Sequence, residues 1–266
     1  MSTDVAPAPA AQPRLLFKRY GRGSVALTGR IAVFVGFVAA WQVASTQTDL
    51  VPSVASTVEA LVDGFRDGTI GPALEISAKA ILSGFAIAVV AGVLCGLWLG
   101  RSRFWGRVLE PIVTTFYAVP RIVLYPVLLS IYGIGTTSER SLAIISAFFP
   151  IAVNSIAGIK SVDPTLIKLG RSVSASRLQM IRKILFPAAS PAIMVGVRIG
   201  WSSAFVTVVA AELIASKGGL GQLLSTSYNL QQYPAMFAIV LLVTVLALTG
   251  SVALWWLERR IRSNVE

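Results

Sequence analysis

Residues 73–100 read ALEISAKAILSGFAIAVVAGVLCGLWLG and form the longest apolar run of the chain. About 20 apolar residues are enough for a helix to cross the hydrocarbon core of a bilayer, so this run predicts a membrane-spanning helix. Small residues recur in it at every fourth position, at Ala80, Gly84, Ala88, Gly92 and Gly96. Such a stripe lets a neighbouring helix approach closely. We therefore expect this helix to lie inside a bundle.

The rest of the chain has the same apolar character. Of its 266 residues, 55% are hydrophobic and 13% are charged, and the mean hydropathy is +0.74. A soluble domain has roughly 25% charged residues. Apolar runs that could each cross a membrane cover residues 30–46, 73–100, 109–131, 140–159, 190–214 and 234–257. The sequence predicts an all-α integral membrane protein with about six transmembrane helices.

The distribution of Lys and Arg predicts the orientation of these helices. With a cytoplasmic amino terminus, seventeen Lys and Arg residues lie on the inside and three on the outside. Basic residues favour the cytoplasmic side, so both termini are expected there, in the cytoplasmic (inner) membrane of a prokaryote. The expected organisation is a basic tail at 1–29, a transmembrane domain at 30–257 with a cytoplasmic loop at 160–190, and a second tail at 258–266.

The composition excludes several classes of function. There is no histidine and only one cysteine, Cys95, so disulfides and Cys/His metal sites are ruled out. The net charge of +11 does not indicate nucleic acid as a partner, because the basic residues interrupt apolar runs instead of sharing one soluble face. A membrane lipid surface is the expected partner of these charges.

Two segments depart from a simple spanning helix. Residues 52–68 have apolar residues on one face and acidic residues on the opposite face of a helix. This pattern predicts a short amphipathic helix, which we expect to lie flat on the outer surface. The run 109–131 contains Pro111, Pro120 and Pro126, which predicts a helix interrupted near mid-membrane. Broken backbone at that depth is tolerated beside a cavity, so this run is expected to border a pathway. Alternatively, the prolines only reflect their higher frequency in membrane helices.

The loop at 160–190 carries ordered helix signals. Asp163 can cap a helix that starts at Pro164, and a second helix is predicted to start at Ser174 or Ser176 and to stop near Pro187. Two short helices at the cytoplasmic face suit a docking surface for a cytosolic partner. The alternative is a loop whose six cations neutralise anionic lipid.

Four segments resemble those of a known family: KLGRSVSASRLQMIRKILFPAASPAIMVGVR (168–198), VPRIVLYPVLLSIYGIG (119–135), FFPIAVNSIAGIKSVDP (148–164) and AAELIASKGGLGQLL (210–224). They resemble permease subunits of binding-protein-dependent ABC importers, of the subfamily for nitrate, sulfonates and taurine. In that family the first segment is the Glu-Ala-Ala loop. Ile184 and Pro187 match its spacing. The departures from its pattern are Lys168 for Glu, Leu169 and Gly170 for the two Ala, Ser174 for Gly, and Phe186 for Leu.

The resemblance implies a type I importer permease fold and a set of partners. These are a second permease chain, most simply in a homodimer, two cytoplasmic ABC ATPase subunits and an extracytoplasmic solute-binding protein. The loop would insert into the ATPase, and the residues expected to couple there are Asp163, Leu166, Lys168, Gly170, Arg171, Ser174, Ala175 and Arg177. No G-x-x-x-x-G-K-[ST] motif occurs in the chain, so ATP and Mg²⁺ are expected on the partner ATPase, with no cofactor and no enzymatic site in this chain.

Charged and polar residues inside the spans are candidates for the solute pathway. Arg121 is expected near the midplane, with Tyr117 and Tyr125 four residues to either side, as a grip for a carboxylate or sulfonate. Arg198 could contact solute or serve a structural role. Asn154, Trp201 and Ser202 are candidate lining residues. Glu212 is expected either to latch an outer gate or to tie the following glycine-rich loop to backbone donors.

The expected function is the inward passage of a small, anionic solute of the sulfonate, taurine, nitrate or carboxylate class. One alternative is a permease for a neutral or heterocyclic nutrient such as a thiamin precursor. A transporter driven by an ion gradient is a further alternative, but such proteins usually carry acidic residues in their spans, and Glu212 alone fits that description here. A scaffold or protein-insertion factor would move no solute.

Overall fold

The computed structural model describes residues 22–48 and 50–262, and all regular elements within these ranges are helical. In chain order they are α1 (Arg22–Gln47), α2 (Val54–Arg66), α3 (Ile70–Arg101), α4 (Arg103–Ala118), the 3-10 turn η1 (Arg121–Leu124), α5 (Tyr125–Tyr132), α6 (Thr136–Lys160), α7 (Pro164–Ser172), α8 (Arg177–Met180), the π-helical turn η2 (Ile181–Leu185), α9 (Phe186–Ile214), α10 (Leu220–Asn229) and α11 (Tyr233–Arg262). The chain divides into two units at residues 49 and 50, and α1 lies in the first.

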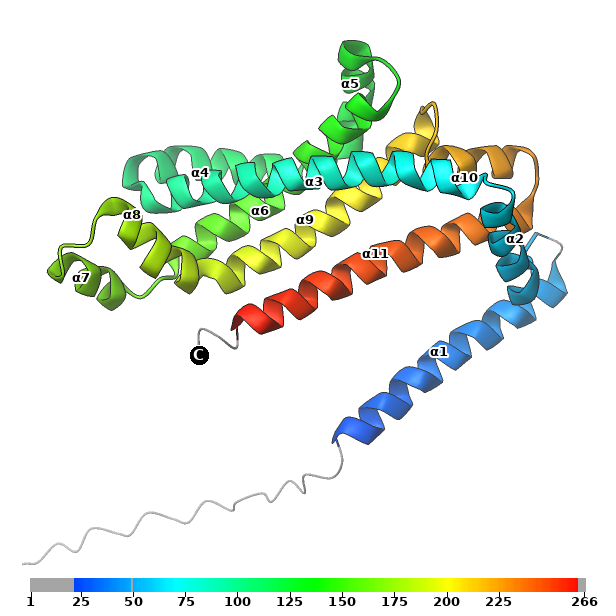
Figure 1. Ribbon diagram of the computed structural model, residues 1–266, viewed down its shortest axis with the longest axis horizontal. Coiled ribbons are helices and arrows are strands. Elements are labelled where there is room, and N and C mark those ends of the chain that lie inside the picture. Colours follow the sequence, from blue (N-terminus) through cyan, green and yellow to red (C-terminus); the bar gives the residue numbers. More distant parts are fainter. Residues whose placement is uncertain (1–21, 49, 263–266) are drawn as a thin grey trace, which may run out of the picture. The chain divides into compact units, whose positions relative to one another are not determined.

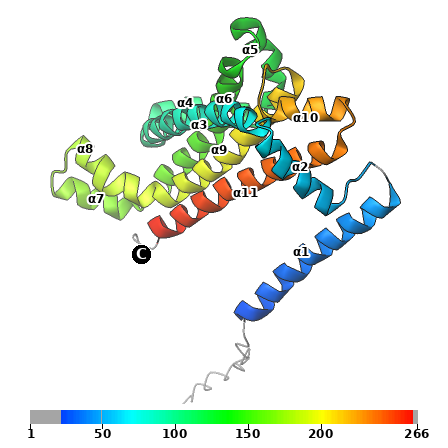
Figure 2. The same cartoon turned by 45° about the vertical axis from the view of Figure 1, so that its right-hand side comes forward.

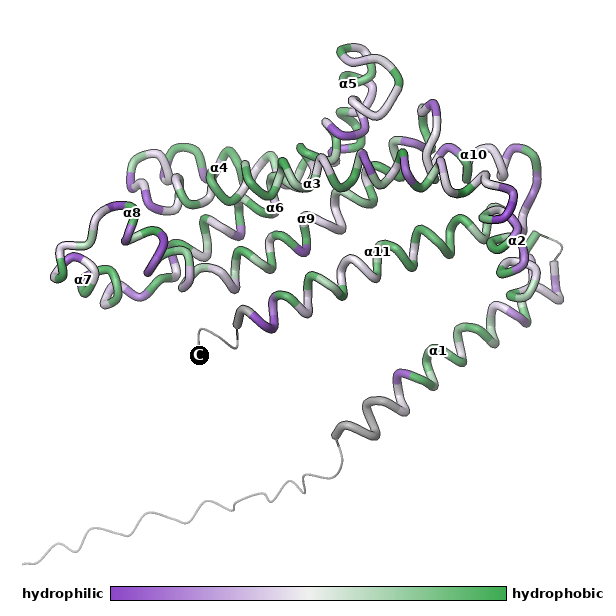
Figure 3. The backbone as a smooth tube through the Cα atoms, in the orientation of Figure 1, coloured by the Kyte–Doolittle hydropathy of each residue, from purple (hydrophilic) through white to green (hydrophobic). Residues whose placement is uncertain are grey.

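The expected spans agree with the long helices of the described chain. Five helices are long and apolar enough to cross a membrane, and the pair α4 and η1–α5 passes the same test when taken as one broken span. The residues of α3 and α11 are hydrophobic over most of each helix, whereas α7 and α8 mix hydrophilic and hydrophobic residues and the carboxyl end of α11 is hydrophilic (Figure 3). Helix α1 begins at Arg22, within the expected tail at 1–29, and the part of it that could cross a membrane begins at Thr28. Residues 1–21 and 263–266 lie outside the described residues.

Three helices form the centre of the second unit. Helix α6 packs between α3 and α9, and α11 lies along α9 (Figures 1 and 2). The stripe of small residues on α3 faces α6, as expected. A Cβ added to Gly84 would lie 2.6 Å from the Cβ of Ala143, and one added to Gly96 would lie 2.2 Å from the Cβ of Ser155. On the other side of α6, a Cβ at Gly196 of α9 would lie 2.7 Å from the Cβ of Asn154.

The third span is broken, and only one of its three prolines breaks it. Helix α4 ends at Ala118, and the axis of the following pair η1–α5 is bent by 91° relative to α4. Pro120 lies in the break with extended backbone, because a proline ring restricts its own φ and disfavours helical backbone at the residue before it. Pro111 lies inside α4, and Pro126 lies in the first turn of α5, where no amide donor is needed. The predicted interruption is confirmed.

The expectation that the second loop helix stops near Pro187 is wrong. Helix α8 continues through η2 into α9, so that Arg177–Ile214 forms one helical stretch. A proline lacks the amide hydrogen and its ring collides with the carbonyl four residues earlier in a regular helix. The wider π turn at Ile181–Leu185 precedes Pro187 and accommodates it without ending the helix.

The amphipathic segment after α1 is a helix, α2, capped by Ser53, whose Oγ accepts a hydrogen bond from the amide of Ser56 at 3.1 Å. It contacts α11 and α3. Thr57 is buried, whereas Val58, Val62 and Phe65 remain 41–47% exposed. The position of α2 on the outer membrane surface remains a prediction.

The close contact between α3 and α6 gives a first prediction. Gly96→Ala should lower the free energy of unfolding by about 1–3 kcal/mol, because the new methyl group would overlap Ser155. The thermal unfolding midpoint of the purified protein in detergent measures this. Gly71→Ala in the same helix is the matched control, since its Cβ would meet no atom within 4 Å. An equal effect of the two substitutions would contradict the packing described for α3.

Candidate solute site and coupling loop

Helix α9 presents one face to an open cavity of about 570 Å³. We call it the arginine cavity; its lining residues are Arg121, Arg198, Ile199, Ser202, Ser203, Val206, Thr207 and Ser251. Residues 198, 202 and 206 repeat at helical spacing and therefore share a face of α9. Arg121 comes from η1 and Ser251 from α11. Two guanidinium groups and four hydroxyls thus border one space, and no carboxylate is among the lining residues.

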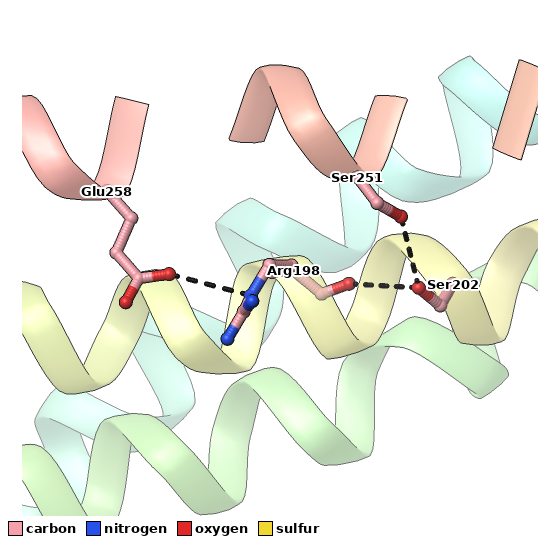
Figure 4. Close-up of polar contacts among 4 residues, drawn as sticks. All are labelled: Arg198, Ser202, Ser251 and Glu258. Carbon is pink, nitrogen blue, oxygen red and sulfur yellow. Dashed lines mark hydrogen bonds and ion pairs between the residues drawn. The ribbon is translucent and has the colours of Figure 1, made fainter. Parts of the chain in front are cut away.

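Arg198 is held by helix α11. Its Nε lies 3.5 Å from Oε2 of Glu258, a residue that is only 8% exposed (Figure 4). One turn along α9, the Oγ of Ser202 donates to the carbonyl of Arg198 at 3.4 Å and lies 3.5 Å from the Oγ of Ser251 (Figure 4). Among the described residues, the terminal nitrogens of Arg198 have no hydrogen-bond partner. The cation is therefore positioned by one carboxylate and keeps donors available toward the cavity.

Arg121 is held by the end of α4. One of its terminal nitrogens, Nη2, donates to the carbonyl of Tyr117, and its guanidinium carbon lies 4.9 Å from the centre of the Tyr117 ring. The carbonyl at this helix end has no helical partner, so a cation is favourable beside it. The Nε of Arg121 is buried without a partner among the described residues.

The expectation that Tyr117 and Tyr125 flank Arg121 on one helix face is wrong for Tyr125. Arg121–Leu124 form the 3-10 turn η1, which has three residues per turn, so a residue four positions after Arg121 does not share its face. Tyr125 is fully buried, and its hydroxyl donates to the carbonyl of Ala215 at 2.6 Å, next to the end of α9. Tyr117 alone accompanies the arginine.

Two other candidates for the pathway, Asn154 and Trp201, lie outside the arginine cavity. The amide of Asn154 donates to the carbonyl of Pro150 at 2.8 Å, inside α6. The indole of Trp201 donates to the carbonyl of Ala247 at 3.3 Å, and its ring packs edge-on against Phe85 at 5.4 Å. Neither residue lines the arginine cavity.

Glu212 joins the glycine-rich loop after α9 to the bundle. This is one of the two roles expected for it; the other is a latch of an outer gate. Its Oε2 accepts from the amide of Gly221 at 2.8 Å, and the Oγ of Ser77 donates to its Oε1 at 2.7 Å. The same hydroxyl accepts from the amide of Leu220 at 2.8 Å. Glu212 is 1% exposed, so these bonds satisfy a buried carboxylate and join α3, α9 and α10.

Sequence reasoning missed a second buried carboxylate, Glu139. It lies in the first turn of α6, is fully buried and accepts from the Oγ of Ser216 at 2.5 Å. The expected fourth span began at residue 140 and so left Glu139 outside it. The signal that could have found it is an acidic residue four positions after Gly135, where a helix amino terminus favours negative charge.

The loop at 160–190 is built from two capped helices, as expected. The carboxylate of Asp163 accepts from the amide of Thr165 at 2.7 Å, and this bond holds the pKa of Asp163 below its ordinary value. Ser176, one of the two predicted starts, caps α8 in a reciprocal pair with Gln179. The turn between the helices is closed by hydrogen bonds from the amides of Ser174 and Ala175 to the carbonyls of Arg171 and Gly170, both at 3.0 Å.

One side of α7 leaves apolar side chains exposed. Leu166, Leu169 and Val173 are 42%, 59% and 69% exposed and lie at helical spacing on one face. Lys168 is also exposed and has no ion pair among the described residues. Arg171, Ala175 and Arg177 turn the other way and line a cavity between the loop and the end of α3. The loop therefore has an apolar outer face and a basic inner one.

Residues 88–263 match the protein family described as "Binding-protein-dependent transport system inner membrane component". The chain belongs to this family. It is 32% identical to the taurine transport system permease protein TauC of Escherichia coli over 74% of this chain and 72% of the relative. It is 31% identical to the putative aliphatic sulfonates transport permease SsuC of E. coli, over 85% of this chain and 87% of the relative. The nitrate import permease NrtB of Synechococcus elongatus is 30% identical to this chain, over 80% of this chain and 81% of the relative.

Solved structures share the fold of this permease. A chain of the MetNI methionine ABC transporter in an inward-facing conformation has a TM-score of 0.55 at 23% identity, over 72% of this chain and 92% of that one. A chain of an amino acid ABC transporter has a TM-score of 0.58 at 20% identity, over 71% of this chain and 92% of that one. The expected fold of an ABC importer permease is confirmed, and the chain is a permease subunit of an ABC importer.

The geometry of the loop explains one departure of this permease from its family's pattern, at Gly170, and shows that another, at Ser174, is unfavourable for the backbone. A Cβ at Gly170 would lie 2.6 Å from the Cδ1 of Ile184 and 2.7 Å from the Cε of Met180, so glycine allows α7 to pack against η2 and α8. Ser174 has a φ of 52°, the left-handed backbone that glycine adopts at low cost, and it stands where the resemblance expects Gly. Nothing in the structure explains Lys168 in place of Glu.

Ser174 provides a second prediction. Ser174→Gly should stabilise the turn by about 1 kcal/mol, because a left-handed backbone disfavours side chains with a Cβ. Hydrogen exchange of the Ala175 amide, which bonds to Gly170, should become slower. Lys168→Gly, at an exposed position in the middle of α7, is the matched control and should make exchange faster, since glycine weakens helix interiors. Faster exchange after Ser174→Gly would show that the turn does not have this conformation.

Proposed function

We propose that this permease passes a small anionic solute of the sulfonate, taurine, nitrate or carboxylate class inward, driven by ATP hydrolysis on a separate subunit. The observation that carries the proposal is the arginine cavity, in which Arg121 and Arg198 face one space with four hydroxyls and no lining carboxylate. Its volume of about 570 Å³ exceeds what such solutes need. Relatives named for taurine, aliphatic sulfonates and nitrate support the same class.

The energetics of membrane-embedded charge favour this reading. An arginine within a span costs about 2.5–3.5 kcal/mol on insertion scales and is usually retained where it faces a water-filled cavity. The guanidinium donates in a planar fork that fits carboxylate, sulfonate and nitrate oxygens. Arg121 uses one N–H donor for the carbonyl of Tyr117, and Arg198 is paired with Glu258 through Nε. Each guanidinium therefore has further N–H donors for an anion.

A neutral or heterocyclic nutrient is the second candidate. It is favoured by the same two contacts, because Glu258 and the Tyr117 carbonyl already give each arginine a structural partner. In that case the arginines would hold α11 and the broken span in place and would not touch solute. A carrier driven by an ion gradient is disfavoured because Glu212 and Glu139, the buried acids at the outer end of the bundle, are engaged by Ser77, Gly221 and Ser216.

Uptake by the complete transporter in proteoliposomes tests the solute class. With ATP inside and the binding protein outside, Arg121→Ala should reduce the rate about ten-fold at taurine, sulfonate or nitrate concentrations well below the KM, because a charge-assisted hydrogen bond to the solute is lost. Arg121→Lys should retain part of the rate. Arg66→Gln removes an equal charge from an exposed pair with Asp63 and should change nothing. Unchanged anion uptake after Arg121→Ala would exclude the proposed role of this residue.

Glu258 distinguishes the two roles of Arg198. If Arg198 binds the anion, Arg198→Ala should abolish uptake, whereas Glu258→Gln should leave it intact, because the cation remains in the cavity. If Arg198 serves only to hold α11, both substitutions break the same ion pair and should lower uptake equally. Thermal unfolding of both variants reports the loss of the pair independently of transport.

The proposal includes the partner subunits that the sequence predicts. Two ATPase subunits, which carry ATP and Mg²⁺, dock on the loops of a permease dimer, and a solute-binding protein docks outside. Both termini then lie in the cytoplasm. The exposed apolar face of α7 supports an ATPase contact, because such faces are usually covered by a partner. Asp163 and Gly170 support this face from within the loop by capping and packing.

The ATPase contact can be tested by charge insertion. Leu169→Glu should strongly reduce recovery of the ATPase subunits with affinity-purified permease, since it places a carboxylate in the centre of the exposed apolar face. Leu230→Glu is the matched control: Leu230 is 62% exposed but follows α10, at the other end of the bundle from the loop (Figure 1). Equal recovery with Leu169→Glu and with the unchanged chain would place the ATPase contact elsewhere.

A further inference from the structure

Two adjoining cavities separate the cytoplasmic loop from the end of α3. The first, of about 310 Å³, is bordered by three arginines, Arg101 of α3, Arg171 of α7 and Arg177 of α8. The second, of about 580 Å³, shares Arg101 and Arg177 with it and is otherwise lined mainly by apolar side chains. Those side chains are Leu94, Leu97, Trp98, Leu178 and Ile181. A cationic compartment therefore opens into an apolar groove.

The three arginines lack acidic partners within the described chain. No ion pair of the described residues involves Arg101, Arg171 or Arg177. The nearby acids are engaged elsewhere, since Asp163 caps α7 and Glu110 pairs with Lys160. Three like charges around one cavity repel one another, and an anion between them would offset this repulsion. The compartment is thus complementary to a group with several negatively charged oxygens.

The apolar groove is complementary to the hydrocarbon part of an amphiphilic molecule whose anionic group lies in the cationic compartment. Leu94 is 60% exposed, Trp98 is 53% exposed and Leu178 is 61% exposed, so the groove presents open apolar surface. Trp98 and Trp105 pack with ring centres 5.8 Å apart, beside the cytoplasmic end of α3. Tryptophans favour the interface between headgroups and acyl chains. From Arg101 to Leu94 the helix rises about 10 Å, enough to follow the upper part of an acyl chain.

We propose that this composite site binds one anionic phospholipid, with its phosphate between Arg101, Arg171 and Arg177 and an acyl chain along Leu94, Trp98 and Leu178. Because Arg101 belongs to the bundle and the other two arginines to the loop, the headgroup joins the loop to α3. The proposal does not depend on the identity of the solute. It concerns the inner face of the loop, whereas the proposed ATPase contact lies on the outer face of α7.

Native mass spectrometry of the full-length permease in detergent tests lipid binding directly. Phosphatidylglycerol should remain bound at a ratio about ten-fold higher than phosphatidylcholine, because the choline cation of the latter offsets its phosphate and is repelled by the three arginines. The combined variant Arg101→Gln, Arg171→Gln and Arg177→Gln should lose this preference. The matched control Arg103→Gln, Arg107→Gln and Arg182→Gln removes the same charge from cytoplasmic-side residues outside both cavities and should keep it.

Further measurements distinguish a bound phospholipid from a free anion and from non-specific surface charge. Leu178→Gln leaves every arginine in place and should weaken phosphatidylglycerol binding several-fold if the acyl chain uses the groove. Inorganic phosphate at millimolar concentration should not displace the lipid; displacement would assign the compartment to a free anion and overturn the proposal. Equal loss in the control variant would reveal non-specific surface charge and would also overturn it.

Equal retention of phosphatidylglycerol by the combined variant and the unchanged chain would contradict the proposed site. Thermal unfolding of each variant identifies a chain that no longer folds, and Leu178→Gln then supplies the deciding measurement. In the assembled transporter, retention of the lipid after the ATPase binds is the expected result. Its displacement would assign Arg171 and Arg177 to the ATPase contact and would overturn the proposal.

Discussion

Close packing of α6 between α3 and α9 is the constraint on which the rest of this permease depends. Glycines at 84 and 96 on α3, and at 196 on α9, let the three backbones approach to distances that a single methyl group would prevent. Helices in lipid gain little from burying apolar surface, so this contact must come from shape and small residues. It fixes α9, whose cavity-facing side carries Arg198, and it fixes the end of α6 from which the loop at 160–190 departs.

The loop and the arginine cavity are joined by continuous helix. Arg177 at the start of α8 and Arg198 in α9 lie on one helical stretch, because the π turn at Ile181–Leu185 carries the helix past Pro187. A rigid element transmits a displacement of one end to the other, whereas a flexible connection would absorb it. Movement of the loop would therefore act on the side of α9 that faces the cavity. At the opposite end of α9, Glu212 and Ser77 anchor the loop that follows the helix.

Sequence reasoning predicted most of the fold because the bilayer imposes simple rules. Apolar run length, the four-residue stripe on α3 and the caps at Asp163 and Ser176 are local signals, and each was confirmed. The failures arose where tertiary contacts decide. Pro187 predicts the end of a helix, but the π turn before it lets the helix continue. Tyr125 lies four residues from Arg121, but the 3-10 turn between them directs it toward Ala215. Glu258 lay in an expected tail, and only the packing of α11 on α9 brings it to Arg198.

The central claim is that Arg121 and Arg198 make one cavity attractive to anions, and thiol labelling tests it most directly. Ser202→Cys in a Cys95→Ser background places a reporter on the cavity wall. A sulfonate-bearing methanethiosulfonate reagent should react about ten-fold faster than its trimethylammonium counterpart, after correction for their rates with a free thiol, because two fixed cations concentrate anions. Arg121→Gln should reduce that preference. An equal or reversed preference in the chain with both arginines would contradict the account.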